Sequence, residues 1–407
     1  MTMADIEAPP LPYETMAALR SIGYKFPQAL ADVVDNSIDA GSSEIKLEVM
    51  AHPESAADSY VLLMDDGVGM THDQLVKAMQ LGGSNSSAES LGKFGMGMKT
   101  ASLSQCERML VGSLKDGDFY GYAWDMDVLK RKGKWLLESV SRSDFPPKAR
   151  EHLKNIKSGT IVMWTRLRAY KDKSAGVAAR SLDTAVLDAQ SYLSTVFHRF
   201  LSGEIKGRKV TIKLNGDYVL SPWDPYCRPE KARKTLDQVT LKVETINGFA
   251  GSITFDPVVL PSQDGFSSAR AFTMAGGYNK WNDMQGFYFY RNNRLIAFGG
   301  WDRLRAKDEK VKFLRVAIDY TVNREMDDEL AIDVSKESAS IPESLRQKID
   351  KYLTQWIKVA RDNYSKDRDE PDRKKEKKFS LLEVERMLIR EAQGDEKITI
   401  KKLFRKL

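Results

Sequence analysis

Cysteine and histidine are scarce in this sequence. Its 407 residues include two cysteines, Cys106 and Cys227, and four histidines. Two thiols cannot form a disulfide framework, and the histidines are scattered without the spacing of metal ligands. We therefore expect neither a disulfide-stabilised fold nor a zinc site, and the few thiols are typical of a protein of a reducing compartment.

Long apolar stretches are also missing. No run approaches the ~18 residues that a membrane-spanning helix requires. Asp5 and Glu7 lie where a secretory signal would carry positive charge, and no apolar segment follows them. The hydrophobic fraction of 42% is nevertheless sufficient for buried cores. We expect a cytoplasmic protein without membrane association.

Charge is unevenly distributed along the chain. Residues 1–100 contain 6 Lys and Arg against 14 Asp and Glu, a net charge of −8, whereas the remainder contains 57 against 43, a net charge of +14. This asymmetry indicates separate tasks, with a polyanion such as DNA as one partner of the basic part. Solvated lysines that keep a large protein in solution explain the same numbers equally well.

Hydrophobic periodicity divides the chain into alternating helices and strands. It predicts helices at residues 28–40, 71–81, 182–200 and 343–363, and strands at residues 45–50, 60–64, 108–112, 119–124, 135–139, 159–167 and 209–214. Residues 220–229 contain three prolines and mark the best boundary. We therefore predict a first domain of residues 1–228, a second of residues 229–365, and a charged linker with a helical tail at residues 366–407.

The helix predicted at residues 28–40 has one apolar and one acidic side. Asp32 and Asn36, four residues apart, present a carboxylate and an amide oxygen side by side. Asn is a poor helix former, and its amide oxygen is a ligand for hard cations. The pair can hold an activated water and Mg²⁺ together, although a solvated acidic face explains this segment too.

A second motif follows the strand predicted at residues 60–64. Asp65 at the strand end can accept a hydrogen bond from an exocyclic amine, and Gly67 and Gly69, which precede Met70, let the backbone approach a flat ring closely. By itself, the segment is equally an ordinary Asp-Gly turn that leads into a helix.

The third motif is rich in glycine. Its residues are Gly92, Lys93, Phe94, Gly95, Met96, Gly97, Met98, Lys99 and Thr100. Glycines here can turn successive amides toward an anion, and a following helix adds its N-terminal dipole. The segment fails as a Walker A loop because Met98 separates Gly97 from Lys99 and no strand precedes it. Three motifs in this order indicate a nucleotide site.

Together, residues 32–40, 65–70 and 92–100 resemble the three nucleotide-binding boxes of the GHKL ATPases, which include the gyrase B subunit, the ninety-kilodalton heat-shock chaperones, histidine kinases and MutL. Within that superfamily, residues 91–102 are most similar to MORC ATPases and their prokaryotic relatives. Ser158, Gly159 and Thr160 resemble the later Gly-Thr strand, and residues 286–298 resemble the start of the second MORC domain.

The resemblance implies an α+β fold with ATP and Mg²⁺ as cofactors. The first domain would be a two-layer GHKL, or Bergerat-fold, α/β sandwich with a mixed, mostly antiparallel sheet. A smaller α+β transducer-like domain and a charged helical tail would follow it.

The resemblance also implies a role for each motif residue. Asp32 would be the general base, Asn36 would coordinate Mg²⁺, Asp65 would take the adenine amino group with support from Thr160, and Lys336 would reach the terminal phosphate. The glycine motifs would complete the nucleotide-binding set, with residues 82–91 as a lid: Gly67, Gly69, Met70, Gly92, Lys93, Phe94, Gly95, Met96, Gly97, Met98 and Lys99. The family usually has Glu where this chain has Asp32, which is one methylene shorter, so we expect ATP binding to survive and turnover to be slow.

Three functions remain open. The leading one is an ATP-gated homodimer that acts on DNA, as a MORC-like or MutL-like clamp in prokaryotic DNA defence or maintenance. The second is a chaperone-like protein-remodelling ATPase, and the third is a non-hydrolysing nucleotide sensor that recruits a partner through residues 379–407. The sequence has no nuclease motif, so any DNA cleavage would come from a partner nuclease or another effector protein.

Overall fold

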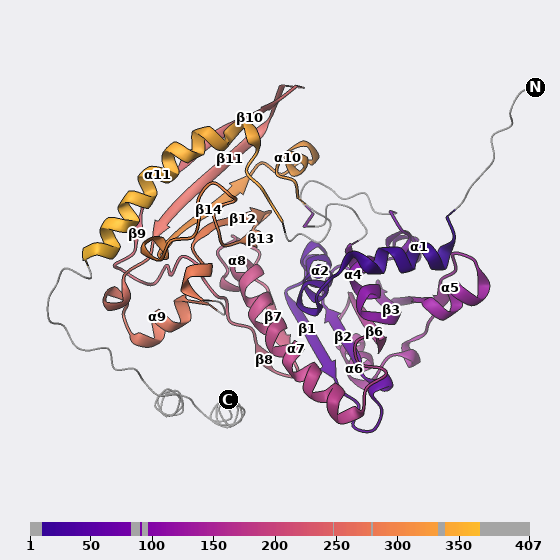
Figure 1. Ribbon diagram of the computed structural model, residues 1–407. Coiled ribbons are helices and arrows are strands. Elements are labelled where there is room, and N and C mark those ends of the chain that lie inside the picture. The colour runs from indigo at the N-terminus through magenta and orange to yellow at the C-terminus, as the bar shows by residue number, and fades with distance from the viewer. Residues whose placement is uncertain are drawn as a thin grey trace, which may run out of the picture. The chain divides into compact units, whose positions relative to one another are not determined.

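The chain is built on two sheets, each with its own helices (Figure 1). The computed structural model describes residues 10–82, 90–91, 97–246, 248–277, 280–332 and 338–366. We call the elements from α1 to β8 the first module and those from β9 to α11 the second module. The chain divides into two compact units, Met1–Tyr364 and Ser365–Leu407, and both modules belong to the first. The predicted boundary at residue 228 falls between the last strand of the first module and the first strand of the second, and the predicted division into domains stays a prediction.

The sheet of the first module has eight strands in the order β5-β4-β3-β6-β2-β1-β7-β8. All neighbours pair antiparallel except β1 and β7, which are parallel. The strands are β1 (Glu44–Met50), β2 (Tyr60–Asp65), β3 (Cys106–Lys115), β4 (Asp118–Asp125), β5 (Glu138–Ser139), β6 (Gly159–Leu167), β7 (Thr211–Leu214) and β8 (Tyr218–Val219). This confirms the predicted α+β fold with a mixed, mostly antiparallel sheet.

Alternation along the central strands divides the core of the first module between the two sheet faces. Val61 and Leu63 of β2 belong to the larger core, which includes residues of α2 (Phe26–Asp39), α4 (Gly97–Gln105) and α7 (Ala175–Val196). Leu62 and Met64 belong to a smaller core with α6 (Pro147–Asn155). The helices α2 and α4 of the larger core therefore carry the first motif and the end of the third on one face of the sheet. The remaining helices of this module are α1 (Pro12–Leu19), α3 (His72–Met79), α5 (Met126–Lys132) and α8 (His198–Ser202).

Local signals in the sequence set the ends of the helices that flank the motifs. Pro27 occupies the first turn of α2, the Gln28 side chain accepts from the Lys25 amide at 2.7 Å, and Gly41 follows the helix with a φ of 74°. Thr71 caps α3, and its side chain accepts from the Gln74 amide. α3 ends at Met79, two residues before the predicted end.

The sheet of the second module runs β10-β11-β14-β12-β13, and β9 pairs with β11. Its strands are β9 (Lys234–Thr235), β10 (Val239–Thr245), β11 (Gly248–Val259), β12 (Gly286–Arg291), β13 (Arg294–Phe298) and β14 (Leu314–Tyr320). Its helices are α9 (Ala269–Ala275), α10 (Arg324–Glu329) and α11 (Glu343–Lys366). Leu345, Ile349 and Leu353 of α11 belong to the core of this module, which is the amphipathic spacing that predicted the helix.

Two predicted elements are broken or shortened in the structure. The helix predicted at residues 182–200 is two helices, α7 and α8, because Phe197 leaves helical geometry where its ring is fully buried. The strand predicted at residues 135–139 shortens to β5, since Gly133 reverses the chain after α5 with a φ of 58°. Across the described ranges, no helix is both long and apolar enough to span a bilayer. The predicted helical tail lies beyond the described residues.

Candidate functional site

Asp32 lies in the middle of α2 and is almost fully buried, with 2% of its surface exposed. Tyr24 donates a hydrogen bond from its hydroxyl to Oδ2 of Asp32 at 2.9 Å. Burial and the neighbouring Asp32 carboxylate hold the pKa of Tyr24 well above its usual value, so Tyr24 remains a donor. A Cβ at Gly97 would lie 3.0 Å from Oδ2 of Asp32. Glycine at this position thus lets the start of α4 approach the carboxylate closely.

Asn36 lies one turn after Asp32 and is exposed. Its Nδ2 donates to the backbone carbonyl of Asp32 at 2.6 Å, which leaves its Oδ1 as the atom available to a cation. In the described part of the chain, no group of three His, Cys, Asp or Glu side chains could hold a metal ion. The Asn36 oxygen is therefore suited to be one ligand of a Mg²⁺ ion whose other ligands are nucleotide phosphates and water.

Asp65 ends β2 with a buried carboxylate of fixed orientation. Its Oδ1 accepts from the amides of Gly67 at 2.9 Å and Thr160 at 3.1 Å, and its Oδ2 accepts from the hydroxyl of Ser37 at 2.8 Å. Burial raises the pKa of Asp65, and these three donors oppose that shift. Because the donors fix the carboxylate plane, Oδ2 can present a defined acceptor to an exocyclic amine.

The loop after Asp65 packs tightly against β3 and β6. Gly69 has a φ of 62°, and a Cβ there would lie 2.0 Å from the carbonyl oxygen of Leu114, so only glycine fits. The Met70 amide donates to Ser113 Oγ at 2.9 Å, and Ser158 Oγ donates to the carbonyl of Gly67 at 2.8 Å. The second motif and the Gly-Thr strand predicted from the sequence are therefore adjacent.

Lys99 of α4 is buried and bonded to another element. Its Nζ donates to the carbonyl of Ala78 in the last turn of α3 at 2.8 Å. Burial lowers the pKa of Lys99 to about 8. The predicted contact of Lys99 with phosphates stays a prediction.

Part of the predicted site lies outside the described residues. This applies to Gly92, Lys93, Phe94, Gly95, Met96 and Lys336, and to residues 83–89 of the predicted lid. The last two residues of that segment are described. Leu91 donates its amide to both carboxylate oxygens of Asp39 at 3.0 and 2.9 Å, and Ser90 Oγ donates to Asp39 Oδ2 at 2.6 Å.

A buried arginine of the second module reaches the back of α2. Arg294 of β13 is 1% exposed, and its Nε donates to Oδ1 of Asp35 at 2.9 Å. Its Nη2 lies 3.9 Å from Oδ1 of Asp32. Sequence reasoning missed this arginine, together with Tyr24 and Ser37, because only the fold brings them to the motifs. The one signal in the sequence was the position of this Arg between two short apolar segments. A charge is costly to bury without a partner, so an Arg at this position predicts a buried acidic partner.

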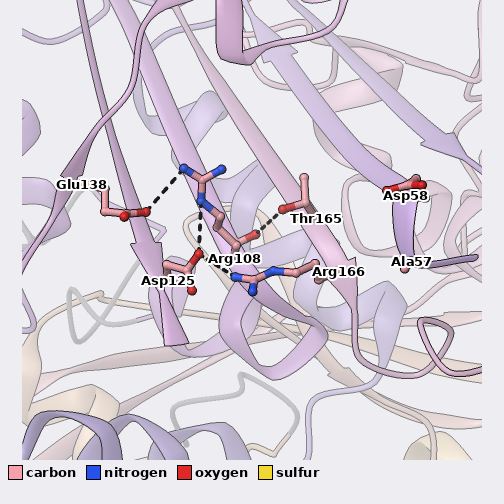
Figure 2. A pocket seen from close by; sticks show the side chains of 7 residues that line it. All are labelled: Ala57, Asp58, Arg108, Asp125, Glu138, Thr165 and Arg166. Carbon is pink, nitrogen blue, oxygen red and sulfur yellow. Dashed lines mark hydrogen bonds and ion pairs between the residues drawn. The ribbon is translucent and has the colours of Figure 1, made fainter. Parts of the chain in front are cut away.

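A hollow of about 530 Å³ elsewhere in the first module is a different kind of site. Ala57, Asp58, Arg108, Asp125, Glu138, Thr165 and Arg166 line it. Figure 2 shows Arg108 between Asp125 and Glu138, each 3.4 Å away, and Arg166 against Asp125 at 2.6 Å. These carboxylates neutralise both guanidinium groups, so the hollow does not favour an anion such as a nucleotide phosphate.

Comparison with known proteins agrees with this geometry. Residues 24–160 match the family described as histidine kinase-, DNA gyrase B-, and HSP90-like ATPase. A relative, ATPase morc-1 of Caenorhabditis elegans, is 27% identical over 89 residues, which cover 22% of this chain and 10% of that protein. The matched range runs from Tyr24 to Thr160, so it contains every predicted site residue except Lys336. Residues 24–160 are thus similar to the GHKL ATPases, and part of the chain resembles a MORC ATPase.

Proposed function

We propose that the protein binds Mg-ATP between α2, the loop after β2 and the start of α4, and hydrolyses it slowly. The observation that carries this proposal is the convergence of three sequence motifs on one face of the sheet. Asp32, Asn36 and Asp65 come from α2 and β2, and Gly97 brings α4 against Asp32. This is the arrangement expected where adenine, Mg²⁺ and phosphates are bound in line.

The adenine end of the proposed site is formed by Asp65 and its neighbours. The amides of Gly67 and Thr160 and the hydroxyl of Ser37 all donate to the Asp65 carboxylate. Such a carboxylate accepts a hydrogen bond from the adenine amino group, whereas the carbonyl that guanine carries at the equivalent position would be repelled. The proposal therefore includes a preference for ATP over GTP.

The metal and phosphate end is formed by Asn36 and the start of α4. Oδ1 of Asn36 would coordinate Mg²⁺, and the amides at the N-terminus of α4 would face the phosphates. When bound, Mg²⁺ neutralises charge on the phosphate oxygens. Lys336 and residues 92–96, which would complete this end, lie outside the described residues.

Slow turnover follows from the surroundings of Asp32. A general base must take a proton from the attacking water. Tyr24 donates to one oxygen of Asp32, and the charge of Arg294 lies 3.9 Å from the other. Both interactions stabilise the negative charge of this carboxylate, which is also one methylene shorter than the Glu usual at this position. The same surroundings favour a second candidate function, a nucleotide-held switch that binds ATP without turning it over.

The proposal extends to an ATP-gated homodimer that acts on DNA. Closure of two copies would use the binding free energy of the terminal phosphate to shift a two-state equilibrium. The support is the likeness to GHKL ATPases and to MORC ATPases. A partner nuclease or other effector protein would supply any DNA cleavage.

A cluster of exposed cations supports the DNA part of the proposal. Lys130, Arg131 and Lys132 form the last turn of α5, and Lys134 and the 37%-exposed Trp135 follow. Among the described residues, none of these four cations has a carboxylate partner within ion-pair distance. Attraction to the negative end of the helix dipole explains the cations in the last turn of α5, but it does not explain Lys134, which lies beyond the helix. Lys130 lies over the Tyr13 ring, 5.5 Å from its centroid. Exposed cations beside the Trp135 indole suit a nucleic acid, with phosphates on the cations and a base on the ring.

Turnover by wild type, Asp32→Asn, Asp32→Glu and Asn36→Ala tests the proposal, with ATP binding measured on each. We expect Asp32→Asn to bind ATP without turnover and Asn36→Ala to lose Mg-dependent binding. If the wild type binds ATP without turnover and Asp32→Glu gains it, the protein is a nucleotide-held switch. If no variant binds ATP, the proposal is wrong.

A further inference from the structure

The turn between β12 and β13 contacts the first module through four consecutive residues. Arg291 and Asn292 bond to Ser90, Asn293 accepts from Arg199, and Arg294 pairs with Asp35. Asn292 and Asn293 have φ values of 47° and 71°, a left-handed pair that forms a tight hairpin turn. One rigid turn thus reaches α2, α8 and the chain that leads into the glycine motif.

The Ser90–Leu91 segment is held from two sides. Its Ser90 carbonyl accepts from Arg291 Nη1 and from Asn292 Nδ2, the latter at 3.2 Å. On the other side, the Leu91 amide and the Ser90 hydroxyl both donate to Asp39 of α2. The Leu91 side chain is 1% exposed. The position of these two residues is therefore set jointly by α2 and by the turn of the second module.

Arg291 is itself fixed by the second module. It is 4% exposed, and its Nε and Nη2 donate to Asp327 of α10 at 3.0 to 3.2 Å. The hydroxyl of Tyr320 donates to the same carboxylate at 2.6 Å. A guanidinium held in this way presents its remaining Nη1 in a defined direction. The contact with Ser90 thus depends on the packing of α10 against β14 and β12.

We infer that Arg291 and Asn292 are positioning residues for the phosphates of the bound nucleotide, although neither belongs to the nucleotide site. This inference rests on the proposed function. Gly92, which starts the predicted phosphate motif, follows Leu91 directly in the sequence. By holding Ser90, the turn fixes where that motif begins. Linkage then requires the converse: phosphate binding stabilises the contact between the turn and the first module.

Two neighbouring asparagines provide a matched test. Asn292→Gly removes the side-chain donor to Ser90, and Asn293→Gly removes the acceptor of Arg199 in the same turn. Glycine adopts positive φ readily, so both variants keep the turn. If the turn served only to join the modules, the two substitutions would have equal effects. A role in positioning the phosphates predicts that only Asn292→Gly changes nucleotide affinity.

The measurement is the dissociation constant for Mg-ATP of the full chain, with adenosine as the probe that lacks phosphates. We expect Asn292→Gly to weaken the binding of ATP about 3- to 10-fold, the range for one hydrogen bond, and to leave the binding of adenosine unchanged. Asn293→Gly should match the wild type for both ligands. If the two variants lose ATP affinity equally, the inference is wrong. It is also wrong if Asn292→Gly loses as much affinity for adenosine as for ATP. Either result leaves the proposed function standing.

Hydrogen exchange at the Leu91 amide gives a second readout that does not need nucleotide. This amide is bonded to Asp39, so its exchange reports opening of the Ser90–Leu91 segment. We expect faster exchange in Asn292→Gly than in Asn293→Gly. Identical exchange in the two variants contradicts the inference, and failure of the wild type to bind ATP contradicts the proposed function and this inference together.

Discussion

Arg294 Nε donates to Asp35 Oδ1 at 2.9 Å, and both side chains are almost completely buried. The two residues are 259 positions apart in the sequence. The pair joins β13 of the second module to the helix that carries Asp32 and Asn36. The charge next to the proposed catalytic base therefore comes from the other module.

Loss of this arginine should destabilise the fold strongly. Arg294→Met removes the buried positive charge that pairs with Asp35, which we expect to lower the free energy of unfolding by about 3–5 kcal/mol. Urea denaturation measures the change. Lys213→Met, which removes a surface partner of Glu44, is the control and should cost much less. Adding Asp35→Asn to Arg294→Met should restore part of the loss, and no restoration would argue against an uncompensated charge as the cause.

Tyr24 should restrain turnover rather than assist it. Tyr24→Phe removes the donor to Asp32 Oδ2 and keeps the ring. With one donor fewer, the Asp32 carboxylate should accept a proton from water more readily, so we expect kcat to rise about 2- to 10-fold. ATP affinity should stay within about twofold of the wild type. A fall in kcat would show instead that Tyr24 orients the base.

The buried amine of Lys99 predicts a pH dependence of stability. Its pKa is lowered from 10.5 to about 8 in the folded chain, so the unfolded chain binds more protons between these values. Stability should therefore rise as the pH increases from 8 to 10.5, by about 1–3 kcal/mol from this group. The check is the difference in free energy of unfolding between wild type and Lys99→Met, measured by denaturation at each pH. All other groups titrate in both proteins, so their contributions cancel in this difference. A difference that does not change with pH would contradict the burial of a titrating Lys99.

The cations of α5 should contribute to DNA affinity more than other exposed cations do. The triple variant Lys130→Gln, Arg131→Gln and Lys132→Gln should weaken binding of a DNA duplex at least about tenfold and reduce its salt dependence. The matched control replaces Arg142, Lys154 and Lys157 with Gln and so changes the net charge by the same amount. These three residues line a hollow of about 630 Å³ beside α6. Equal losses in the two variants would mean that only net charge matters. DNA binding that does not weaken with salt would contradict phosphate contacts altogether.

Much of the fold followed from the sequence because its signals are local. Pro27 and Gly41 marked α2, Thr71 marked the start of α3, and the apolar run of residues 60–64 became the central strand β2. The break between α7 and α8 did not follow, because it arises where the Phe197 ring enters the core. Helix periodicity alone runs through that position without a signal.

The candidate site was predictable in its motif residues and not in the groups that support them. The spacing of Asp32 and Asn36 and the placement of Asp65 are properties of single elements. Ser37 and Thr160 meet at Asp65 only because α2 and β6 pack beside β2. Arg294 reaches Asp35 across the two modules, and no local pattern encodes such a contact. The assignments of Lys336 and residues 92–96 stay predictions.

Equilibrium binding of Mg-ATP to the wild type, Asn36→Ala and Asp65→Asn tests the central claim most directly. Asn36→Ala removes the proposed magnesium ligand, and Asp65→Asn replaces one carboxylate oxygen with an amide that repels the adenine amino group. Thermal unfolding of each variant establishes that it is folded. We predict saturable, magnesium-dependent binding by the wild type, with ATP preferred to GTP, and at least about tenfold weaker binding by each variant. Binding by folded variants that equals the wild type, or no binding by the wild type, would contradict the assignment of this site to Mg-ATP.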